Sequence, residues 1–271
     1  MTAANSELES RLEFAVQIAR EAGDQTLALF RSDQLDLNRK ADGSPVTAAD
    51  RAAEQLLRKR IDEQFPADAI LGEEFGETDG TSGFRWVLDP IDGTKAFISG
   101  VPLYTTLVAV MQNDEPQIGV IYAPAAGEMV YAARGSDCWH VVGDQPAKQC
   151  RVSNVDQLSD AVFVTTSVRS YTKDRNPDGR PVYDQLENEC RITRTWADAF
   201  GYLLVATGRA EIMIDPIMNL WDTAAVQPVI EAAGGHFFDW KGQPSVHSGE
   251  AIATNRQLAE TVKRITANTN S

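Results

Sequence analysis

The chain has 271 residues with ordinary apolar and charged fractions, enough to bury one large core or two small ones. Its formal net charge of −14 argues against nucleic acid or an anionic membrane as a general partner, because both require a positive surface. No apolar run approaches the roughly 20 residues that span a bilayer, and the polar start does not resemble a secretory signal. Cys138, Cys150 and Cys190 are widely separated without a C-x-x-C motif, so we expect a reducing, cytoplasmic setting and small buried thiols.

The first half of the chain combines predicted helices with predicted antiparallel strands. Apolar spacing indicates amphipathic helices over 6–31 and from Thr47 to about Gln64, with a polar turn-rich loop over 33–46 between them. A turn over 113–116 favours an antiparallel pair of strands on either side of it. The strand patterns of this half lie at 85–89, 104–111, 117–122, 129–134 and 139–142.

Strands and helices alternate in the second half. We expect a polar loop over 170–181 and a helix over 197–207 that stops at Gly208. A further helix is predicted over 222–233, where Pro228 should kink it or remove a hydrogen bond. The remaining predicted elements are strands at 162–166, 211–214 and 251–253 and a helix after Asn255. The pattern predicts a layered α/β or α+β fold with a change of subdomain near residue 150.

The most informative motif is Asp89-Pro90-Ile91-Asp92-Gly93-Thr94, which follows a short apolar strand. Pro90 keeps Asp89 extended, and one turn can direct Asp89 and Asp92 to the same point. Gly93 allows close backbone approach to a ligand, and Thr94 can begin a helix whose free N–H groups would face a phosphate. The alternative is that both aspartates only cap a turn, since Asp-Pro and Asp-Gly are common in loops.

Two carboxylates beside a phosphate would repel each other and the substrate unless a hard cation lies between them. Mg²⁺ prefers oxygen ligands and binds through a few carboxylates plus phosphate oxygens. Two such ions, roughly 3.5–4 Å apart, can hold both the attacking and the leaving oxygen of an in-line displacement. Further acids follow apolar segments at Glu73 and Asp222, although Asp222 alone is also compatible with a plain N-cap.

In order and spacing, these motifs resemble the inositol monophosphatase family over nearly the whole chain. The shared pieces are Gly72-Glu73-Glu74, residues 89–94, and Trp221-Asp222 followed by Glu231-Ala232-Ala233-Gly234-Gly235. The resemblance implies an αβαβα sandwich and a Mg²⁺-dependent phosphatase that holds two to three metal ions and forms a homodimer. It places the metal and phosphate site in residues 1–150, and the specificity residues and the last metal ligand in residues 151–271.

The resemblance also implies a role for each site residue. Its first metal would be bound by Glu73, Asp89 and the Ile91 carbonyl, and its second by Asp89, Asp92 and Asp222. Thr94 paired with Asp50 would orient and help deprotonate the attacking water, while the Gly93 and Thr94 amides would hold the phosphate. Lys40, in the loop before Thr47, would approach the site. By its sequence alone, Thr47-Ala48-Ala49-Asp50 reads as a capping box, and one carboxylate can serve both roles.

Residues outside the metal motifs indicate which branch of the family this chain resembles most, and therefore which substrate to expect. Lys95-Ala96-Phe97 departs from the usual inositol phosphatase pattern, and residues 98–103 and 194–211 look most like the histidinol-phosphatase branch. That branch usually has Gly and Cys where this chain has Ala197 and Ala199. Asp198, with Asp215 as a second acceptor, would pair with the ammonium and imidazole of histidinol phosphate. Without the family context, Asp198 reads as an exposed helical acid.

The prediction is therefore hydrolysis of L-histidinol phosphate, a small phosphorylated metabolite. Inositol 1-phosphate and 3′-phosphoadenosine 5′-phosphate are the alternatives within the family. A non-catalytic metal- or phosphate-binding homologue is the alternative from another class. No Gly-x-Ser-x-Gly elbow, Walker loop or dinucleotide fingerprint occurs, and the three histidines lack zinc-type spacing.

Overall fold

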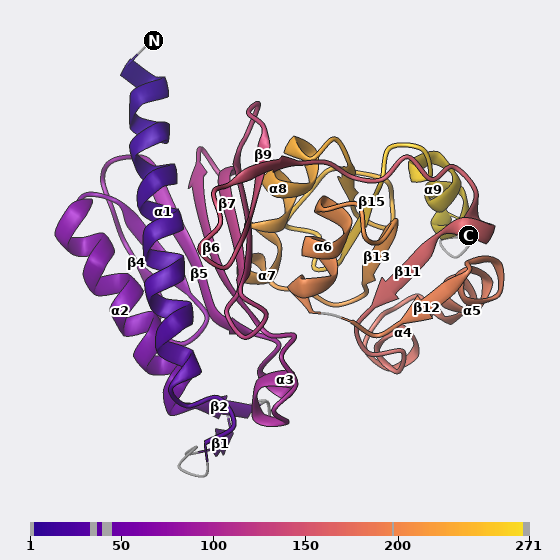
Figure 1. Ribbon diagram of the computed structural model, residues 1–271, viewed down its shortest axis with the longest axis horizontal. Coiled ribbons are helices and arrows are strands. Elements are labelled where there is room, and N and C mark those ends of the chain that lie inside the picture. The colour runs from indigo at the N-terminus through magenta and orange to yellow at the C-terminus, as the bar shows by residue number, and fades with distance from the viewer. Residues whose placement is uncertain (1–2, 33–36, 40–44, 197, 268–271) are drawn as a thin grey trace.

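The elements are stacked in five layers, α-β-α-β-α, which confirms the predicted fold class (Figure 1). The computed structural model describes residues 3–32, 37–39, 45–196 and 198–267. Lys40 and Ala197, two residues singled out from the sequence, lie outside these ranges. No helix among the described residues is both long enough and apolar enough to cross a membrane.

The first two layers are formed by the N-terminal half. Helices α1 (Ala3–Leu27) and α2 (Ala48–Gln64) cover one face of an eight-stranded sheet, and they bury a core that includes Ile18, Leu57 and Trp86. The sheet order is β10-β9-β8-β7-β6-β5-β3-β4, and only the β3–β5 pair is parallel. These strands are β3 Ala69–Gly72, β4 Gly76–Thr78, β5 Phe84–Asp92, β6 Thr105–Gln112, β7 Glu115–Ala123, β8 Glu128–Ala133, β9 Cys138–Val142 and β10 Lys148–Cys150.

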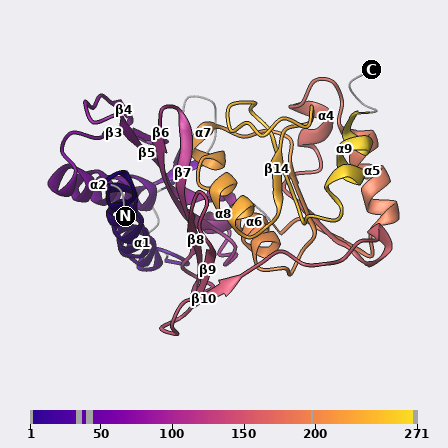
Figure 2. The same ribbon diagram turned by 90° about the horizontal axis from the view of Figure 1, so that it is seen from above.

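The central layer contains α6 (Ala199–Ala206) and α8 (Val226–Ala232), which lie between the two sheets (Figures 1 and 2). Every residue of α6 is buried, as expected for a helix that is apolar on all sides. The largest core cluster joins both helices to β6, β7 and β13, and includes Leu107, Ile121 and Met213. The two sheets are thus held together through a shared apolar layer.

The last two layers are the second sheet and the helices on its outer face. The sheet order is β12-β11-β13-β15-β14, parallel through β12-β11-β13 and antiparallel beyond. The strands are β11 Val162–Thr165, β12 Ile192–Arg194, β13 Ile212–Asp215, β14 His236–Phe238 and β15 Ala251–Thr254. Helices α5 (Arg180–Glu189) and α9 (Ala259–Ala267) pack on the outer face. The chain passes from the first sheet to the second after β10, and a subdomain division at residue 150 stays a prediction.

Short elements complete the fold. They are β1 Leu37–Arg39, β2 Pro45–Thr47, α3 Thr94–Ile98, the 3₁₀ turn Leu158–Asp160, α4 Ser170–Lys173 and α7 Leu220–Thr223. Two segments that were predicted to be loops contain helices or strands, so these predictions were wrong. β1 and β2 pair within the expected loop 33–46, and α4 and the start of α5 fall within 170–181. Pro181 near the start of α5 and the buried Val182 and Leu186 are helix signals that the polar composition hid.

The predicted helix over 222–233 is two helices, α7 and α8, with a break at Ala224-Ala225. Pro228 has no N–H to donate to the carbonyl of residue 224, so a continuous helix would lose that hydrogen bond. In the structure Pro228 is the third residue of α8, where a backbone N–H needs no partner within the helix. The proline therefore ends the first helix rather than kinking a single long one.

The predicted turn over 113–116 is tighter than expected. Asn113 and Asp114 both have positive φ, 53° and 65°, and Gln112 pairs directly with Glu115. Such a two-residue connection with two left-handed residues matches the twist of the flanking strands. The pair of antiparallel strands is therefore confirmed, with Glu115 and Pro116 already inside β7.

Candidate metal and phosphate site

The site starts from a β-bulge near the end of β5. Asp89 pairs with Leu107, while Asp92 pairs with Thr105, so three steps along β5 match two along β6. In a regular strand, residues three apart point to opposite faces. The extra residue removes that alternation, and Ile91 N–H donates to Asp89 Oδ1 at 3.1 Å to fix the turn. Both aspartates can then face one point.

Asp92 links the two sheets through hydrogen bonds. Its Oδ2 accepts from Thr105 Oγ1 at 2.8 Å and from the Ala199 backbone N–H at 2.6 Å. Ala199 is the first residue of α6, so the central helix layer is attached directly to the bulge. Asp92 is almost fully buried, and these two bonds fix its orientation.

Asp222 enters the site from α7. Its Oδ2 accepts from Asn219 N–H at 2.6 Å within a capping box, so the expected capping role and a place in the site coexist. Oxygens of Asp89, Asp92 and Asp222 all lie within 4.8 Å of one another. Glu73 follows β3, and its N–H donates to the Leu88 carbonyl at 3.2 Å, next to Asp89. Asp222 therefore meets three acids that lie far before it in the sequence, Glu73, Asp89 and Asp92.

The electrostatics of this cluster are those of crowded, buried carboxylates. Burial raises the pKa of Asp89 well above its usual value, and the charges of Glu73, Asp92 and Asp222 raise it further. Burial and the charges of Asp198 and Asp222 raise the pKa of Asp92 in the same way. Burial raises the pKa of Asp222 to about 6, with Glu73 adding to the effect. A divalent cation bound by these oxygens would relieve this repulsion.

A cavity of about 180 Å³ lies at this point of the structure. Its lining comprises Glu73, Asp89, Ile91, Asp92, Gly93, Thr94, Lys95, Asp198 and Asp222. Gly93 precedes α3 with φ of 83°, a left-handed conformation that favours glycine. An oxygen-only donor set of this kind fits hard cations such as Mg²⁺. The cavity unites most of the residues predicted from the motifs.

Asp50 and Thr94, which the family resemblance pairs with each other, have different hydrogen-bond partners in this structure. Asp50 Oδ2 accepts from Thr47 N at 2.8 Å and from Thr47 Oγ1 at 2.5 Å, completing the capping box of α2. Thr94 Oγ1 donates to the Ile91 carbonyl at 3.2 Å. Burial raises the pKa of Asp50, and the charge of Glu73 adds to the shift. The capping role of Asp50 is confirmed, and its pairing with Thr94 stays a prediction.

A second cavity, of about 380 Å³, adjoins the first and shares Lys95 and Asp198 with it. Its other lining residues are Ala96, Thr166, Ser167, Ser170, Asp174, Thr195, Asp215 and Ile217. Asp198 lies just before α6, with Oδ2 packed against Gly93. Burial raises the pKa of Asp198 and of Asp215, and the Asp198 charge raises that of Asp215 further. Asp198 and Asp215 therefore form an acidic wall beside the predicted phosphate site.

Sequence reasoning missed Glu54, which supports the loop that carries Glu73. Glu54 is fully buried on α2, and its carboxylate accepts from the backbone N–H groups of Glu74 at 2.7 Å and Phe75 at 3.2 Å. Arg58 Nε donates to it at 2.8 Å. The sequence signal that could have identified Glu54 is its place on the apolar side of the predicted helix, one turn after Asp50.

The chain matches the model of the inositol monophosphatase family over residues 7–270. The chain belongs to the inositol monophosphatase family. It is 42% identical over 243 residues to a histidinol-phosphatase of Chlorobaculum parvum, covering 90% of this chain and 91% of that protein. A histidinol-phosphatase of Streptomyces coelicolor is 37% identical, with 91% and 93% covered.

Among solved structures, an inositol monophosphatase from Zymomonas mobilis superimposes with a TM-score of 0.81. It is 30% identical in sequence, and the match covers 98% of this chain and 100% of that one. Membership makes the protein a phosphomonoesterase of the inositol monophosphatase family, with a small phosphorylated molecule as substrate. The cluster of Asp89, Asp92 and Asp222 is suited to the metal on which such enzymes depend.

Proposed function

We propose that this protein is a Mg²⁺-dependent histidinol-phosphatase, which hydrolyses L-histidinol phosphate to L-histidinol and phosphate. The observation that carries the proposal is the acidic wall of Asp198 and Asp215 beside the carboxylate cavity. Two relatives at 42% and 37% identity are themselves histidinol-phosphatases, which supports the same choice. A cationic alcohol next to its phosphate needs a negative wall, whereas a neutral inositol ring does not.

The assignment of ligands to individual metal ions follows the family resemblance, and the cluster of carboxylates supports it. In our proposal Glu73, Asp89 and the Ile91 carbonyl bind one Mg²⁺, and Asp89, Asp92 and Asp222 bind a second, with Glu73 facing a weaker third. Bound Mg²⁺ supplies positive charge that neutralises the phosphate oxygens and lowers the pKa of water. The hydrogen bonds from Thr105 and Ala199 hold the Asp92 carboxylate in a fixed orientation.

The remaining residues position water and phosphate. Thr94 and Asp50 are proposed to orient the attacking water and accept its proton, and the Gly93 and Thr94 amides to hold the phosphate. Lys40 is proposed to approach from the loop before β2. The water oxygen forms a bond to phosphorus as the bond to the alcohol oxygen breaks in line, and the alcohol leaves after taking up a proton. A homodimer also stays a prediction.

A phosphate ester of a neutral alcohol is the second candidate, favoured by the 30% identity and full-length match to the Zymomonas mobilis inositol monophosphatase. The first experiment measures kcat/KM with Mg²⁺ for histidinol phosphate, inositol 1-phosphate, 3′-phosphoadenosine 5′-phosphate and fructose 1,6-bisphosphate. We expect histidinol phosphate to have the highest value. If any other substrate of this set exceeds it by tenfold, the histidinol-phosphatase proposal is wrong.

Asp198→Asn tests the acidic wall separately. Removing one partner of a desolvated charge pair costs about 2–5 kcal/mol, so kcat/KM for histidinol phosphate should fall at least 30-fold. The value for inositol 1-phosphate should change less than threefold. Asp174→Asn is the matched control, because Asp174 lines the same cavity but is exposed. Equal losses on both substrates would refute pairing between Asp198 and an ammonium group.

A further inference from the structure

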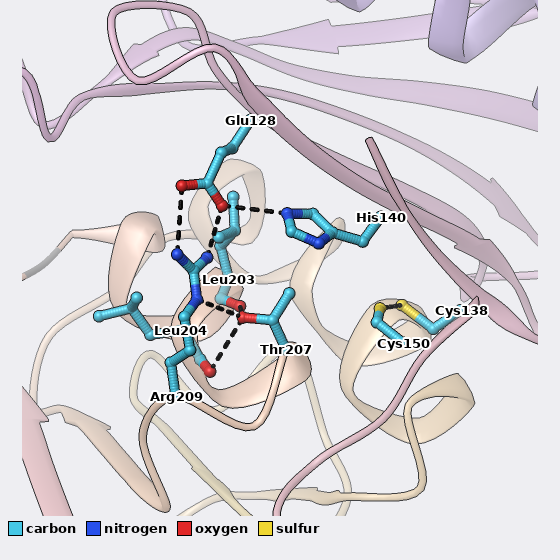
Figure 3. A network of polar contacts seen from close by, with 8 residues as sticks. All are labelled: Glu128, Cys138, His140, Cys150, Leu203, Leu204, Thr207 and Arg209. Carbon is cyan, nitrogen blue, oxygen red and sulfur yellow. Dashed lines mark hydrogen bonds and ion pairs between the residues drawn. The ribbon is translucent and has the colours of Figure 1, made fainter. Parts of the chain in front are cut away.

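Two of the three cysteines face each other at the edge of the first sheet. Cys138 on β9 and Cys150 on β10 are direct partners in the antiparallel register, and their Sγ atoms are 3.4 Å apart. Both are free thiols. Figure 3 shows the two sulfurs pointing toward one another beside the polar network of Glu128, Arg209 and His140. They are twelve positions apart in the sequence, and no local pattern pairs them.

The geometry requires little movement for a bond between these sulfurs. A disulfide has an S–S length of about 2.05 Å, so the sulfurs need to approach by only about 1.4 Å. Directly opposed residues of an antiparallel pair have Cβ atoms roughly 4.5–5.5 Å apart, near the range that a disulfide spans. β10 is the three-residue edge strand of the sheet, so it can move without displacing a neighbour on its outer side.

The two thiols differ in access and in acidity. Cys138 is fully buried, whereas Cys150 is half-buried on the edge strand. The hydrogen bond between the two thiols lowers the pKa of Cys150 despite burial, and the charges of Arg151 and Arg209 contribute. The ion pair of Arg209 with Glu128, at 2.6 Å, keeps that guanidinium in place. A thiolate is the reactive form of cysteine, so Cys150 is the attacking group.

We propose that Cys138 and Cys150 form a reversible dithiol–disulfide site that is oxidised by hydroperoxides. The Cys150 thiolate attacks one peroxide oxygen as the O–O bond breaks, giving a sulfenic acid and releasing hydroxide, or from an organic peroxide an alkoxide that takes a proton from water. Cys138 then attacks the Cys150 sulfur: its S–H proton passes to the departing hydroxyl, the S–O bond breaks, the S–S bond forms and water leaves. With hydrogen peroxide, the two thiols lose two protons and two electrons, and the peroxide is reduced to two waters.

The disulfide would fix the place where the chain leaves the first sheet for the second. Just after Cys150, Val152 N–H donates to the Ala233 carbonyl at 3.0 Å. A Cβ on Gly208, which follows α6, would lie 3.0 Å from the Arg151 carbonyl, so this segment also packs against the end of α6. Closing the covalent loop from Cys138 to Cys150 therefore restricts the unfolded chain and stabilises the crossing segment.

The test treats the folded full-length protein with hydrogen peroxide, removes the peroxide, unfolds the protein in urea to expose buried thiols, alkylates the remaining thiols and maps the peptides by mass spectrometry. We expect one intramolecular Cys138–Cys150 link with the loss of two hydrogens, reversal by dithiothreitol, and Cys190 still alkylated. Cys190 is the internal comparison, because burial raises its pKa to about 12. Cys190→Ser should form the link as the wild type does, and Cys150→Ser should leave Cys138 free to be alkylated.

Thermal unfolding provides the second measurement. The oxidised wild type should melt at least about 4 °C above the reduced form, and Cys150→Ser should show no shift after the same treatment. The proposal is wrong if peroxide leaves both thiols alkylatable, converts Cys150 to a sulfinic acid without a link, or joins two chains through Cys190. A link that forms without raising the melting temperature would refute its stabilising role.

Discussion

Glu54→Gln is the sharpest test of how the site is supported, because Glu54 is not a proposed ligand of the metal or of the substrate. Within the described part of the chain, the hydrogen-bond partners of its carboxylate are all donors: the N–H groups of Glu74 and Phe75 and the Arg58 guanidinium. A glutamine fits the same space, but its NH₂ group must then face one of these donors. The substitution therefore removes the charge and at least one buried hydrogen bond.

The size of the effect follows from burial. A buried hydrogen bond to a charged group contributes about 1.5–3 kcal/mol, and breaking a buried ion pair costs about 3–5 kcal/mol. Arg58 retains bonds to Thr78 and Gly76, so we expect about 3 kcal/mol of lost stability. For a chain of this size that is a fall in melting temperature of roughly 6–12 °C. Because Glu73 lies beside the affected amides, the Mg²⁺ concentration for half-maximal activity should rise about tenfold.

Two assays and one control separate positioning from general stability. Thermal unfolding reports the loss of stability, and Mg²⁺ titration of phosphate release at a temperature well below melting reports the loss of positioning. The change in melting temperature caused by saturating Mg²⁺ checks binding without activity. Glu63→Gln, on the same helix but exposed, should change neither quantity. A Glu54→Gln variant with lowered stability and unchanged Mg²⁺ dependence would refute the positioning role.

Two further predictions concern the packing of the layers and the charge network of Figure 3. Gly119→Ala should destabilise the protein by about 3 kcal/mol or prevent folding, because the new Cβ would lie 2.0 Å from the Ala225 carbonyl oxygen. An unfolding midpoint in urea equal to that of the wild type would contradict this. Burial alone would raise the pKa of Glu128, but hydrogen bonds and charges from Arg209 and His140 lower it. The ionised Glu128 carboxylate therefore stabilises the fold fully above the pKa that it has in the unfolded chain. This contribution is lost as pH falls through the pKa that it has in the folded protein. The difference in the free energy of unfolding by urea between wild type and Glu128→Gln should shrink from pH 6 to pH 3. A constant difference would show that the pKa of Glu128 is not lowered by folding.

The parts of the fold and site that the sequence predicted are those with local causes. Asp89-Pro90-Ile91-Asp92-Gly93 combines a strand end, a proline and a positive-φ glycine within five residues, so its turn was predictable. The convergence of both carboxylates depends on the register of β5 against β6, which no local pattern encodes. The meeting of Glu73 and Asp222 with them was expected only through the family resemblance.

The features that escaped prediction depend on contacts between distant segments. Glu54 is an ordinary helical acid until the chain after β3 turns back over it. Cys138 and Cys150 become neighbours only because β10 pairs with β9 as an edge strand. Pro228 predicted a disturbed helix, but the position of the break at Ala224-Ala225 was not predicted.

The most direct test of the central proposal is phosphate release from L-histidinol phosphate by the purified wild type and by Asp92→Asn, each with and without Mg²⁺. We expect release by the wild type only with Mg²⁺, and a loss of at least about 10³-fold in Asp92→Asn, since its carboxylate lies in the proposed metal cluster. Both proteins should melt cooperatively, which shows that the variant is folded. Mg²⁺-independent release, or a folded Asp92→Asn variant with wild-type activity, would contradict the assignment of this carboxylate site.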